Sequence, residues 1–536
     1  MNETPGNVRL IGGEMLLWSD ADTAADWRGV GLELAGRLVP VGGRVLLAGP
    51  HPAGLVAVAL ERASHAAVVV RSYPDACALG ERHRSLTVHC GRLRALTEEE
   101  PYDLVLALDG LGRTHSAEEP APSWRESFEA LARLVAPGGR LVLAVPNDLG
   151  IDRFVEARPP EREGSDGHWE PHGFDPTHPG GPAALDAALA SAGLVAGGRY
   201  AAYPGRDAPR ALLEHTLLAE ELPEALTVPL AARGGDTMLV ADPLRLARLA
   251  FRHGLGEHLA PLWVTVATRP AADPAADPAA DPLAGLLPAG LVEVGRVVHE
   301  VTATTTRRLP DGSPRPIPRG RVLEEVLVEA CAREDVRAVR HLLARLADWV
   351  EEGGDAPADN LVWDGERFAA VTPLPAPVGP VTTQVVLCRI LWRFAVRLLA
   401  SGHHHPWPWP QSADQLALTL CGMAGRPCGE DELDRARKLD AELGEPAVPS
   451  GTAPAYRDLL STRDRLADQL TAALARVARL ETKLTYRERE LVRARAKLRR
   501  TQRRAAAHRR TLGYRLSRRL ARPRKVARRM LRLLSG

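Results

Sequence analysis

The sequence predicts an α/β fold built on a doubly wound, mainly parallel sheet, and three observations lead to this prediction. Short apolar runs without alternation cover residues 102–108 and 140–145, as is typical of strands buried on both faces. Between these runs, residues 124–135 carry apolar side chains at helical spacing. A Pro-Gly-Gly turn at 137–139 then leads into the second run. Strand, helix, turn and strand make one βαβ unit.

Similar apolar runs predict five more strands, so the predicted sheet has seven strands in all. They cover residues 42–48, 67–70, 87–90, 194–200 and 262–268, and the spacing predicts helices over 55–64 and 183–192. Ligands of such sheets bind beyond the carboxyl ends of the strands. Asp109 and Asn147, which follow two of the strands, are therefore expected at the site.

Composition and cysteine pattern exclude several classes of protein. The chain has 536 residues, enough for several domains, and its charged and hydrophobic fractions are ordinary for globular proteins. Its six cysteines include no CxxC pair, so we expect neither a disulfide framework nor a metal site, and the pattern fits a reducing cytoplasm. The N-terminus lacks the features of a signal peptide. Residues 385–400 carry three arginines on one face, so we expect an amphipathic helix there and no membrane span.

The net charge of +2 hides a strong asymmetry between the body of the chain and its end. Residues 487–536 carry a net charge of +18, so the preceding residues sum to −16. A basic tail on an acidic body concerns partners and not fold.

The first half of the chain resembles a known family. The runs RVLLAGP (44–50), VVVRS (68–72), YDLVLALD (102–109) and LVAPGGRLVLAVPN (134–147) resemble class I S-adenosylmethionine-dependent methyltransferases. The segment YPGRDAP (203–209) is similar to one in methyltransferase-like proteins of bacterial surface-polysaccharide clusters. The resemblance covers about 30–270. It implies a Rossmann-like seven-stranded methyltransferase sheet over 1–270 and S-adenosyl-L-methionine as cofactor. It also implies methylation of a sugar hydroxyl on a cell-surface glycan or its lipid-linked precursor.

The loops that hold the cofactor in this family depart from its pattern. Leu47 stands where an acidic residue is expected, Arg71 replaces the acid that binds the ribose, and Gly91-Arg92 replaces the acid near the adenine. The candidate cofactor-binding residues are Gly49, His51, Gly54, Arg71, Asp75, Arg92 and Asp109. Three readings stay open: altered binding of the same cofactor, loss of the cofactor, or a phosphate-bearing ligand on the two arginines. Both arginines could also be plain surface residues.

Candidate catalytic groups follow the predicted fourth and fifth strands. They are Asp109, His115, Asn147, His168 and His172, the last two in a Gly/Pro-rich segment. A methyl transfer to a hydroxyl group needs a general base, and His or Asp can serve. The alternative for the Gly/Pro-rich segment is a solvated loop.

Beyond the first domain, an AADP repeat at 271–282 predicts a linker. We expect a smaller α+β accessory domain over 283–445. Within it, Asp355 and Asn360 have the spacing of a kinase catalytic loop and resemble aminoglycoside-phosphotransferase-like kinases. Gly353 and Thr372 replace residues that such kinases need, so the resemblance implies a degenerate kinase-like domain.

The C-terminal part predicts two further segments. Over 455–511, apolar or small residues recur at steps of three and four, which indicates a C-terminal coiled-coil helix and hence a homodimer. A single helix packing on the body is the alternative. The tail, 512–536, alternates leucines with arginines and carries Pro523, which should interrupt its helix. This pattern favours an anionic membrane surface over nucleic acid, because phosphate contacts do not need the leucines.

Two functions follow from these observations. The first is a cytoplasmic methyltransferase, peripheral at the inner face of the membrane. The second is a non-catalytic dimeric scaffold with a degenerate methyltransferase fold that takes part in glycan assembly.

Overall fold

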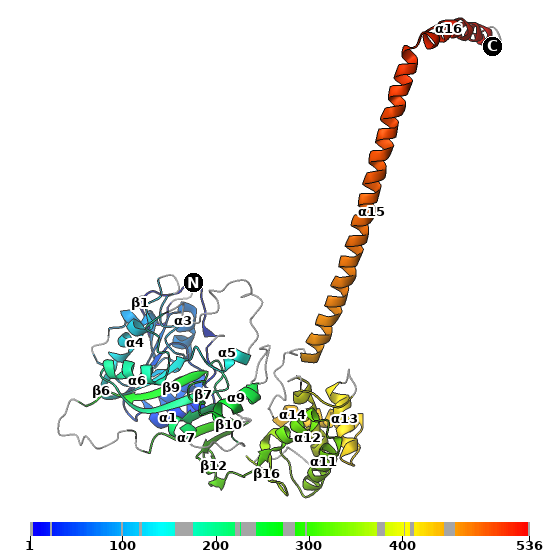
Figure 1. Cartoon of the computed structure of the whole chain (residues 1–536). Helices are drawn as coiled ribbons and strands as arrows, with labels where there is room; N and C mark the ends of the chain where they lie inside the picture. Colours follow the sequence, from blue (N-terminus) through cyan, green and yellow to red (C-terminus); the bar gives the residue numbers. More distant parts are fainter. Residues whose placement is uncertain are drawn as a thin grey trace. The chain divides into compact units, whose positions relative to one another are not determined.

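The computed structural model describes residues 4–21, 24–97, 100–116, 120–155, 175–219, 226, 243–271, 283, 285–294, 297–371, 381–400, 403–407, 412–443 and 456–533. The chain forms two compact units, Met1–Tyr456 and Arg457–Gly536 (Figure 1). Most of the AADP repeat lies outside the described residues, as do His168, His172 and Thr372.

A single large sheet organises the first unit. In chain order its strands are β1 (Val8–Gly12), β2 (Arg44–Ala48), β3 (His65–Val70), β4 (Thr87–Gly91), β5 (Tyr102–Ala107), β6 (Val135–Pro146), β7 (Val195–Tyr203), β8 (Ala211–Glu214), β9 (Leu262–Thr268), β10 (Gly290–Val294), β11 (Val297–Val301), β12 (Thr305–Arg308) and β13 (Arg315–Pro316). All seven predicted strands are present. The predicted count is wrong, however, because the described residues contribute thirteen strands to this sheet.

The strand order is β1-β4-β3-β2-β5-β6-β9-β7-β8-β10-β11-β12-β13. Every neighbouring pair from β1 to β6 is parallel, and β9 then runs antiparallel to both β6 and β7. The chain moves from β2 outward through β3 to β4, then returns to the other side of β2 with β5. This reversal is a topological switch point, where the loops after β2 and β5 diverge and leave room for a ligand.

Helices cover both faces of the sheet, so the doubly wound fold is confirmed (Figure 1). Val45 and Leu47 of β2 pack in one core, and Leu46 and Ala48 pack in the other, as alternating side chains of a buried strand must. The first core contains residues of α1 (Val30–Leu38), α2 (Ala53–Arg62) and α3 (Tyr73–Arg82). The second contains residues of α4 (Trp124–Ala132), α6 (Pro182–Ser191), α7 (His215–Ala219) and α9 (Pro243–Arg252). The short helix α5 (Asp152–Val155) follows β6.

Local signals in the sequence set two of the helix starts. Ser123 caps α4 in a capping box with Glu126, and Ser72 caps α3 by accepting a hydrogen bond from the backbone N–H of Asp75. Such caps satisfy N–H groups that the first turn of a helix leaves without partners.

The sheet continues past the AADP repeat, which corrects the expected start of the accessory domain at residue 283. β10 pairs antiparallel with β8, with Leu291 opposite Leu212, and β11, β12 and β13 follow by further antiparallel pairing. Leu291 is fully buried in the same core as the parallel strands. Strands β10 to β13 therefore extend the first sheet, because β10 pairs with β8 and each later strand pairs with the one before it.

A helical bundle with its own core follows. It consists of α10 (Leu323–Ala332), α11 (Val336–Glu351), α12 (Thr383–Ala400), α13 (Ala413–Met423) and α14 (Glu430–Leu443). A small sheet of β14 (Arg321–Val322), β15 (Leu361–Trp363) and β16 (Phe368–Ala370) lies beside them in the chain. The arginines expected on one face of α12 turn inward. Arg389 and Arg393 are buried and both bond the carboxylate of Asp440 on α14.

The kinase-like segment lies in this bundle, and the carboxylate of its Asp355 is paired with an arginine. Arg389 Nη1 donates to Asp355 Oδ1 at 3.0 Å, and Asn360 closes a short 3-10 turn before β15. The kinase resemblance stays a prediction.

The second unit consists of two helices in its described part. α15 runs unbroken over Tyr456–Arg510, and α16 covers Leu512–Leu533 (Figure 1). The expected interruption at Pro523 is wrong, since the break between the helices falls at Thr511. No described helix of this protein has the length and apolar character needed to cross a membrane.

Candidate functional site

The carboxyl ends of β2 and β5 meet at the switch point, where Gly49 and Asp109 face each other. Gly49 has φ +91, and a Cβ placed on it would lie 3.7 Å from Asp109 Cβ and 3.9 Å from Asp109 Oδ2. This left-handed backbone explains the glycine, because other residues adopt it only at a cost. The close approach leaves Asp109 directly beside the turn.

The side chain of Asp109 is buried, and only one of its carboxylate oxygens accepts a hydrogen bond from the described residues. Oδ1 accepts hydrogen bonds from Arg113 Nη1 at 2.6 Å and from the backbone N–H of Ala25 at 3.2 Å. Oδ2 is buried and has no hydrogen-bond partner among the described residues. Burial raises the pKa of Asp109 to about 6, against the opposing effect of Arg113. A buried acceptor without a partner is costly, so this oxygen is suited to a donor from a ligand.

His51 spans the same turn. Its Nδ1 lies 2.9 Å from the carbonyl oxygen of Gly49, and its Nε2 lies 3.3 Å from the backbone nitrogen of Leu108. A neutral ring with the proton on Nδ1 satisfies both contacts. Burial lowers the pKa of His51 to about 4, so the ring is neutral at physiological pH.

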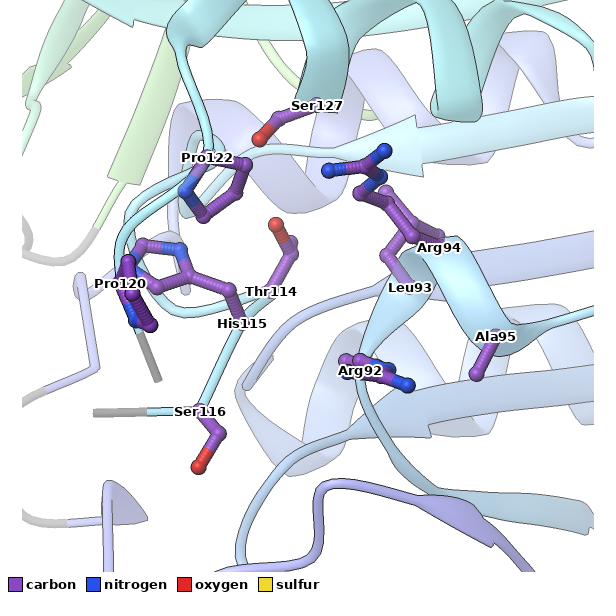
Figure 2. A pocket seen from close by; sticks show the side chains of 10 residues that line it. All are labelled: Arg92, Leu93, Arg94, Ala95, Thr114, His115, Ser116, Pro120, Pro122 and Ser127. Carbon is purple, nitrogen blue, oxygen red and sulfur yellow. The ribbon is translucent and has the colours of Figure 1, made fainter. Parts of the chain in front are cut away.

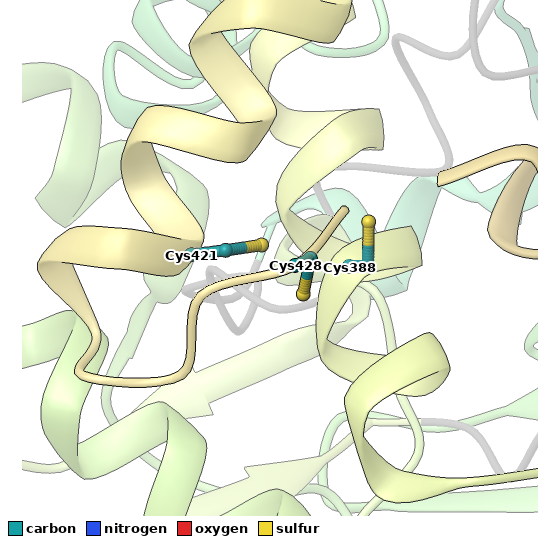
Figure 3. Close-up of side chains that lie close together, drawn as sticks. All are labelled: Cys388, Cys421 and Cys428. Atoms are coloured by element: carbon teal, nitrogen blue, oxygen red, sulfur yellow. The ribbon is translucent and has the colours of Figure 1, made fainter. Parts of the chain in front are cut away.

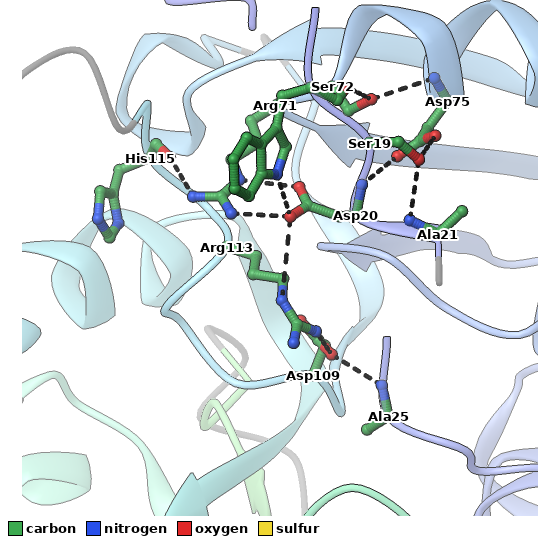
Figure 4. Close-up of polar contacts among 11 residues, drawn as sticks. Ser19, Asp20, Ala21, Ala25, Arg71, Ser72, Asp75, Asp109, Arg113 and His115 are labelled. Carbon is green, nitrogen blue, oxygen red and sulfur yellow. Dashed lines mark hydrogen bonds and ion pairs between the residues drawn. The ribbon is translucent and has the colours of Figure 1, made fainter. Parts of the chain in front are cut away.

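Arg71, at the end of β3, forms a bidentate ion pair with Asp20 (Figure 4). Arg71 Nε and Nη2 donate to the two carboxylate oxygens at 2.8 Å each, and Trp18 Nε1 donates to Oδ1 at 2.9 Å. Burial alone would raise the pKa of Asp20, but the hydrogen bonds from Arg71 and Trp18 outweigh it and lower this pKa. Arg71 is therefore a buried, paired side chain and not a surface arginine.

The segment that supplies Asp20 lies across the strand ends and is called the N-terminal strap below (residues 15–21 and 24–27). Met15 forms a parallel bridge with Ser72, and Trp27 Nε1 donates to the carbonyl of Leu108 at 2.9 Å. Asp75, one of the predicted cofactor-binding residues, accepts from Ser19 Oγ at 2.7 Å and from the backbone N–H of Asp20 at 2.8 Å. The strap thus covers the carboxyl end of β3. No motif in the sequence indicated it.

A cavity of about 360 Å³ opens beside this network, at the ends of β4 and β5 (Figure 2). Arg92, Arg94, Thr114, His115 and Ser127 contribute to its lining. Arg71 Nη1 donates to the carbonyl of His115 at 3.1 Å and so joins the cavity wall to the strap. Burial, followed by the charge of Arg71, lowers the pKa of His115. The cavity is polar and cationic, with a neutral imidazole in its wall.

Two predicted site residues have other roles in the structure. Asn147 Nδ2 donates to the carbonyls of His258 and Ala260 at 2.7 and 2.8 Å, and its Oδ1 accepts from the backbone N–H of Leu149 at 3.0 Å. These bonds use its amide to fasten the loop after β6. Gly54 lies in α2, where a Cβ would meet Leu32 Cδ1 at 3.5 Å, so helix packing and not a ligand adjoins this glycine.

The structure therefore brings together Gly49, His51, Arg71, Asp109 and His115, with Arg92 in the adjoining cavity wall. Sequence reasoning missed Asp20 and Arg113. Arg113 follows Asp109 by four positions and ion-pairs with it, a spacing that could have suggested it. Asp20 had no such signal, because its partner Arg71 lies 51 positions away.

Comparisons with known proteins leave the family of this chain unassigned. No protein-family model matches the sequence, and the search of curated proteins found no match. Among solved structures, the CcbJ methyltransferase from Streptomyces caelestis matches with 16% identity over 51% of this chain and 100% of that chain, at a TM-score of 0.27. A chain of the Haloferax volcanii complex of the Trm112 methyltransferase activator with a methyltransferase matches with 17% identity over 46% and 90%, also at 0.27.

A third structure is a Burkholderia thailandensis N1-methyltransferase with bound 1,6-didemethyltoxoflavin and S-adenosylhomocysteine. It matches with 14% identity over 45% of this chain and 80% of that chain, at a TM-score of 0.23. At such scores the likeness adds nothing to what the strand order and the switch point already say about this protein.

Proposed function

We propose that this protein is an S-adenosylmethionine-dependent methyltransferase that acts on a sugar hydroxyl of a cell-surface glycan or its lipid-linked precursor. The observation that carries the proposal is the pair formed by Gly49 and Asp109 at the switch point. A turn with positive φ faces a buried carboxylate oxygen that lacks a donor. The sugar acceptor is supported only by the resemblance of residues 203–209.

The residues at the switch point fit one end of the cofactor. Asp109 Oδ2 would accept a hydrogen bond from the ammonium group of the methionine moiety, and Gly49 would let the ligand approach its backbone. The resemblance implies that the ribose would bind at the end of β3, where Arg71 replaces the expected acid. Both oxygens of Asp20 are bonded to Arg71 there, so the ribose could bind only if the strap moved. When bound, the cofactor supplies an electrophilic methyl group.

A general base is also available beside the switch point. His115 lines the cavity, and its lowered pKa keeps the imidazole neutral at physiological pH. A neutral imidazole can accept the proton that a hydroxyl group loses as it is methylated. His168 and His172 stay predictions.

Calorimetric titration of the full chain with S-adenosylmethionine and S-adenosylhomocysteine tests the proposal. We expect binding of one ligand per chain, weakened at least about tenfold by Asp109→Asn, because an amide cannot replace the charge that attracts the ammonium group. The matched control is Asp103→Asn, which changes a carboxylate at the opposite end of β5. No binding of either ligand to folded protein would overturn the proposal.

A second function is favoured by the strap itself. The strap and the Arg71–Asp20 ion pair cover the carboxyl end of β3. A non-catalytic scaffold that keeps a methyltransferase-like sheet would be expected to have such a covered end. A scaffold would tolerate Asp109→Ala in cells but fail when residues 457–536 are deleted. The methyltransferase proposal expects Asp109→Ala to abolish function in the same assay.

We further propose that the second unit holds two copies of the chain together and attaches them to an anionic membrane on its cytoplasmic side. Apolar side chains of the seam on α15, among them Leu470 and Leu484, are about 60% exposed, so a partner helix would remove them from water. On α16, Leu516, Met530 and Leu533 are likewise exposed among arginines.

Vesicle sedimentation tests the membrane contact. The full chain should bind vesicles containing phosphatidylserine, and binding should fall with added salt and with Leu516→Ser and Leu533→Ser. Equal binding to neutral vesicles, or tighter salt-dependent binding to duplex DNA, would contradict it.

A further inference from the structure

Three cysteines that the sequence scatters meet in the helical bundle (Figure 3). Cys388 lies on α12, Cys421 lies on α13, and Cys428 lies on the connection that leads from α13 to α14. Their three sulfur atoms all lie within 4.8 Å of one another. All three are free thiols, so the cluster is not explained by a disulfide bond.

The spacing of the sulfur atoms suits a single thiophilic metal ion. A Zn–S bond is about 2.3 Å long, so sulfurs in a tetrahedral zinc site lie about 3.8 Å apart. The sulfur separations here, all within 4.8 Å, differ from that value by no more than about 1 Å. Cysteine thiolates are soft ligands and select zinc or monovalent copper over magnesium or calcium.

The surroundings leave one side of the cluster open. Cys388 and Cys421 are buried, whereas Cys428 is only partly buried, so solvent reaches the cluster from the side of the connection. The carbonyl oxygens of Gln384 and Arg426 lie 3.8 and 3.6 Å from Cys428 Sγ. An ion held by three sulfurs could therefore take water or one of these oxygens as a fourth ligand.

We propose that Cys388, Cys421 and Cys428 form a binding site for one Zn²⁺ ion. The thiols release their protons to solvent as three zinc–sulfur bonds form, and no oxidant or reductant is required. Bound zinc ties residues 424–429 to α12 and α13, because each of these segments contributes a ligand. The sequence predicted no metal site because only closely spaced cysteines were considered, whereas helix packing brings Cys388 to the other two.

The test uses the full chain, reduced and freed of metal with a chelator that is then removed. Zinc uptake is measured by elemental analysis, and cobalt(II) serves as an optical probe through its thiolate absorption bands. We expect one zinc per chain, thiolate–cobalt absorption, and a melting temperature that rises by several degrees when zinc is added.

Variants separate the site from general effects of losing a thiol. Cys428→Ser, at a partly exposed position, should lower zinc affinity by at least about tenfold and remove the rise in melting temperature. Cys77→Ser, also partly exposed but far from the cluster in sequence, should bind zinc as the wild type does. Cys331→Ser makes a second control at a buried cysteine of the same bundle core.

Three results would overturn the proposal. The first is the absence of zinc and cobalt uptake by protein in which thiol titration finds all six cysteines reduced. The second is unchanged zinc binding by Cys428→Ser. The third is uptake of monovalent copper but not zinc.

Discussion

Burial shifts the pKa values of Asp109 and His51 in opposite directions, although both residues lie at the same switch point. It raises the pKa of the carboxyl to about 6 and lowers that of the imidazole to about 4, since in each case the charged form loses solvation. The switch point therefore disfavours charge of either sign. A cationic group entering beside Asp109 would shift its pKa downward again.

The first prediction concerns the pH dependence of stability that Asp109 confers. The pKa of Asp109 is higher in the folded chain than in the unfolded one, so its contribution to stability is full below about pH 4 and is lost as pH rises through 6. Relative to Asp109→Asn, we expect the wild type to lose about 2–3 kcal/mol in unfolding free energy between pH 4 and pH 7.5. Urea unfolding of both proteins at the two pH values measures this. A constant difference between them would contradict the predicted pKa.

The second prediction concerns the ion pair beneath the strap. Arg71→Met leaves Asp20 buried without its main partner, which should cost about 3–5 kcal/mol of unfolding free energy. The double variant Asp20→Asn, Arg71→Met should recover at least half of this loss, because the buried charge is then gone. The control is Arg28→Met, which breaks the exposed Arg28–Asp26 pair and should cost less than about 1 kcal/mol. Equal losses in the single and double variants would show that the pair is not coupled.

At the scale of elements, α12 and α14 are joined by charges that lie inside the bundle. Asp440 bonds both Arg389 and Arg393, all three side chains being buried. The two arginines occupy the face of α12 that the sequence alone suggested would meet solvent. Helix packing reverses that interpretation because α14 brings the compensating carboxylate.

The third prediction follows from this arrangement. Asp440→Asn leaves two buried arginines sharing the remaining acceptors, so the unfolding free energy should fall by about 3–5 kcal/mol. Glu329→Gln on α10, whose ion pairs with Arg321 and Arg333 are exposed, should change it by less than about 1 kcal/mol. Thermal and urea unfolding of both variants provide the comparison. A loss below 1 kcal/mol in Asp440→Asn would mean that water reaches the arginines.

Local patterns predicted the elements whose signals lie within their own residues. The β5–α4–β6 unit, for example, follows from apolar runs, helical spacing and a glycine turn. The pairing of β10 with β8 could not be predicted, because it depends on hydrogen bonds between residues some 80 positions apart. The same limit applies to the site: Gly49 and Asp109 follow from strand ends, whereas Asp20 depends on a strap with no pattern of its own.

At the scale of the whole molecule, two units of different kinds occur in one chain. The first buries its apolar residues in three cores, whereas α15 and α16 expose theirs along their length. The basic tail belongs to the second unit, and the acidic residues lie mainly in the first. This contrast supports the proposal that the first unit is globular and that the helices of the second unit hold two copies of the chain together.

The fourth prediction tests that account. Leu480→Lys combined with Leu484→Lys places charges on two neighbouring positions of the α15 seam. The dissociation constant of the dimer should therefore be at least about tenfold higher in this variant than in the wild type. Lys483→Glu lies between them off the seam and should leave the dimer intact. Analytical ultracentrifugation of full chains measures the mass of each. A monomeric wild type would contradict the coiled-coil interpretation.

The far end of the large sheet has a consequence for how copies of this protein meet. β13 is two residues long and ends at Pro316, which has no backbone N–H to offer a further strand. An open edge of this length that lacks a donor is a poor template for adding strands, and natural proteins avoid aggregation in this way. Copies of this protein that lie close together would therefore gain little by pairing their sheets at β13.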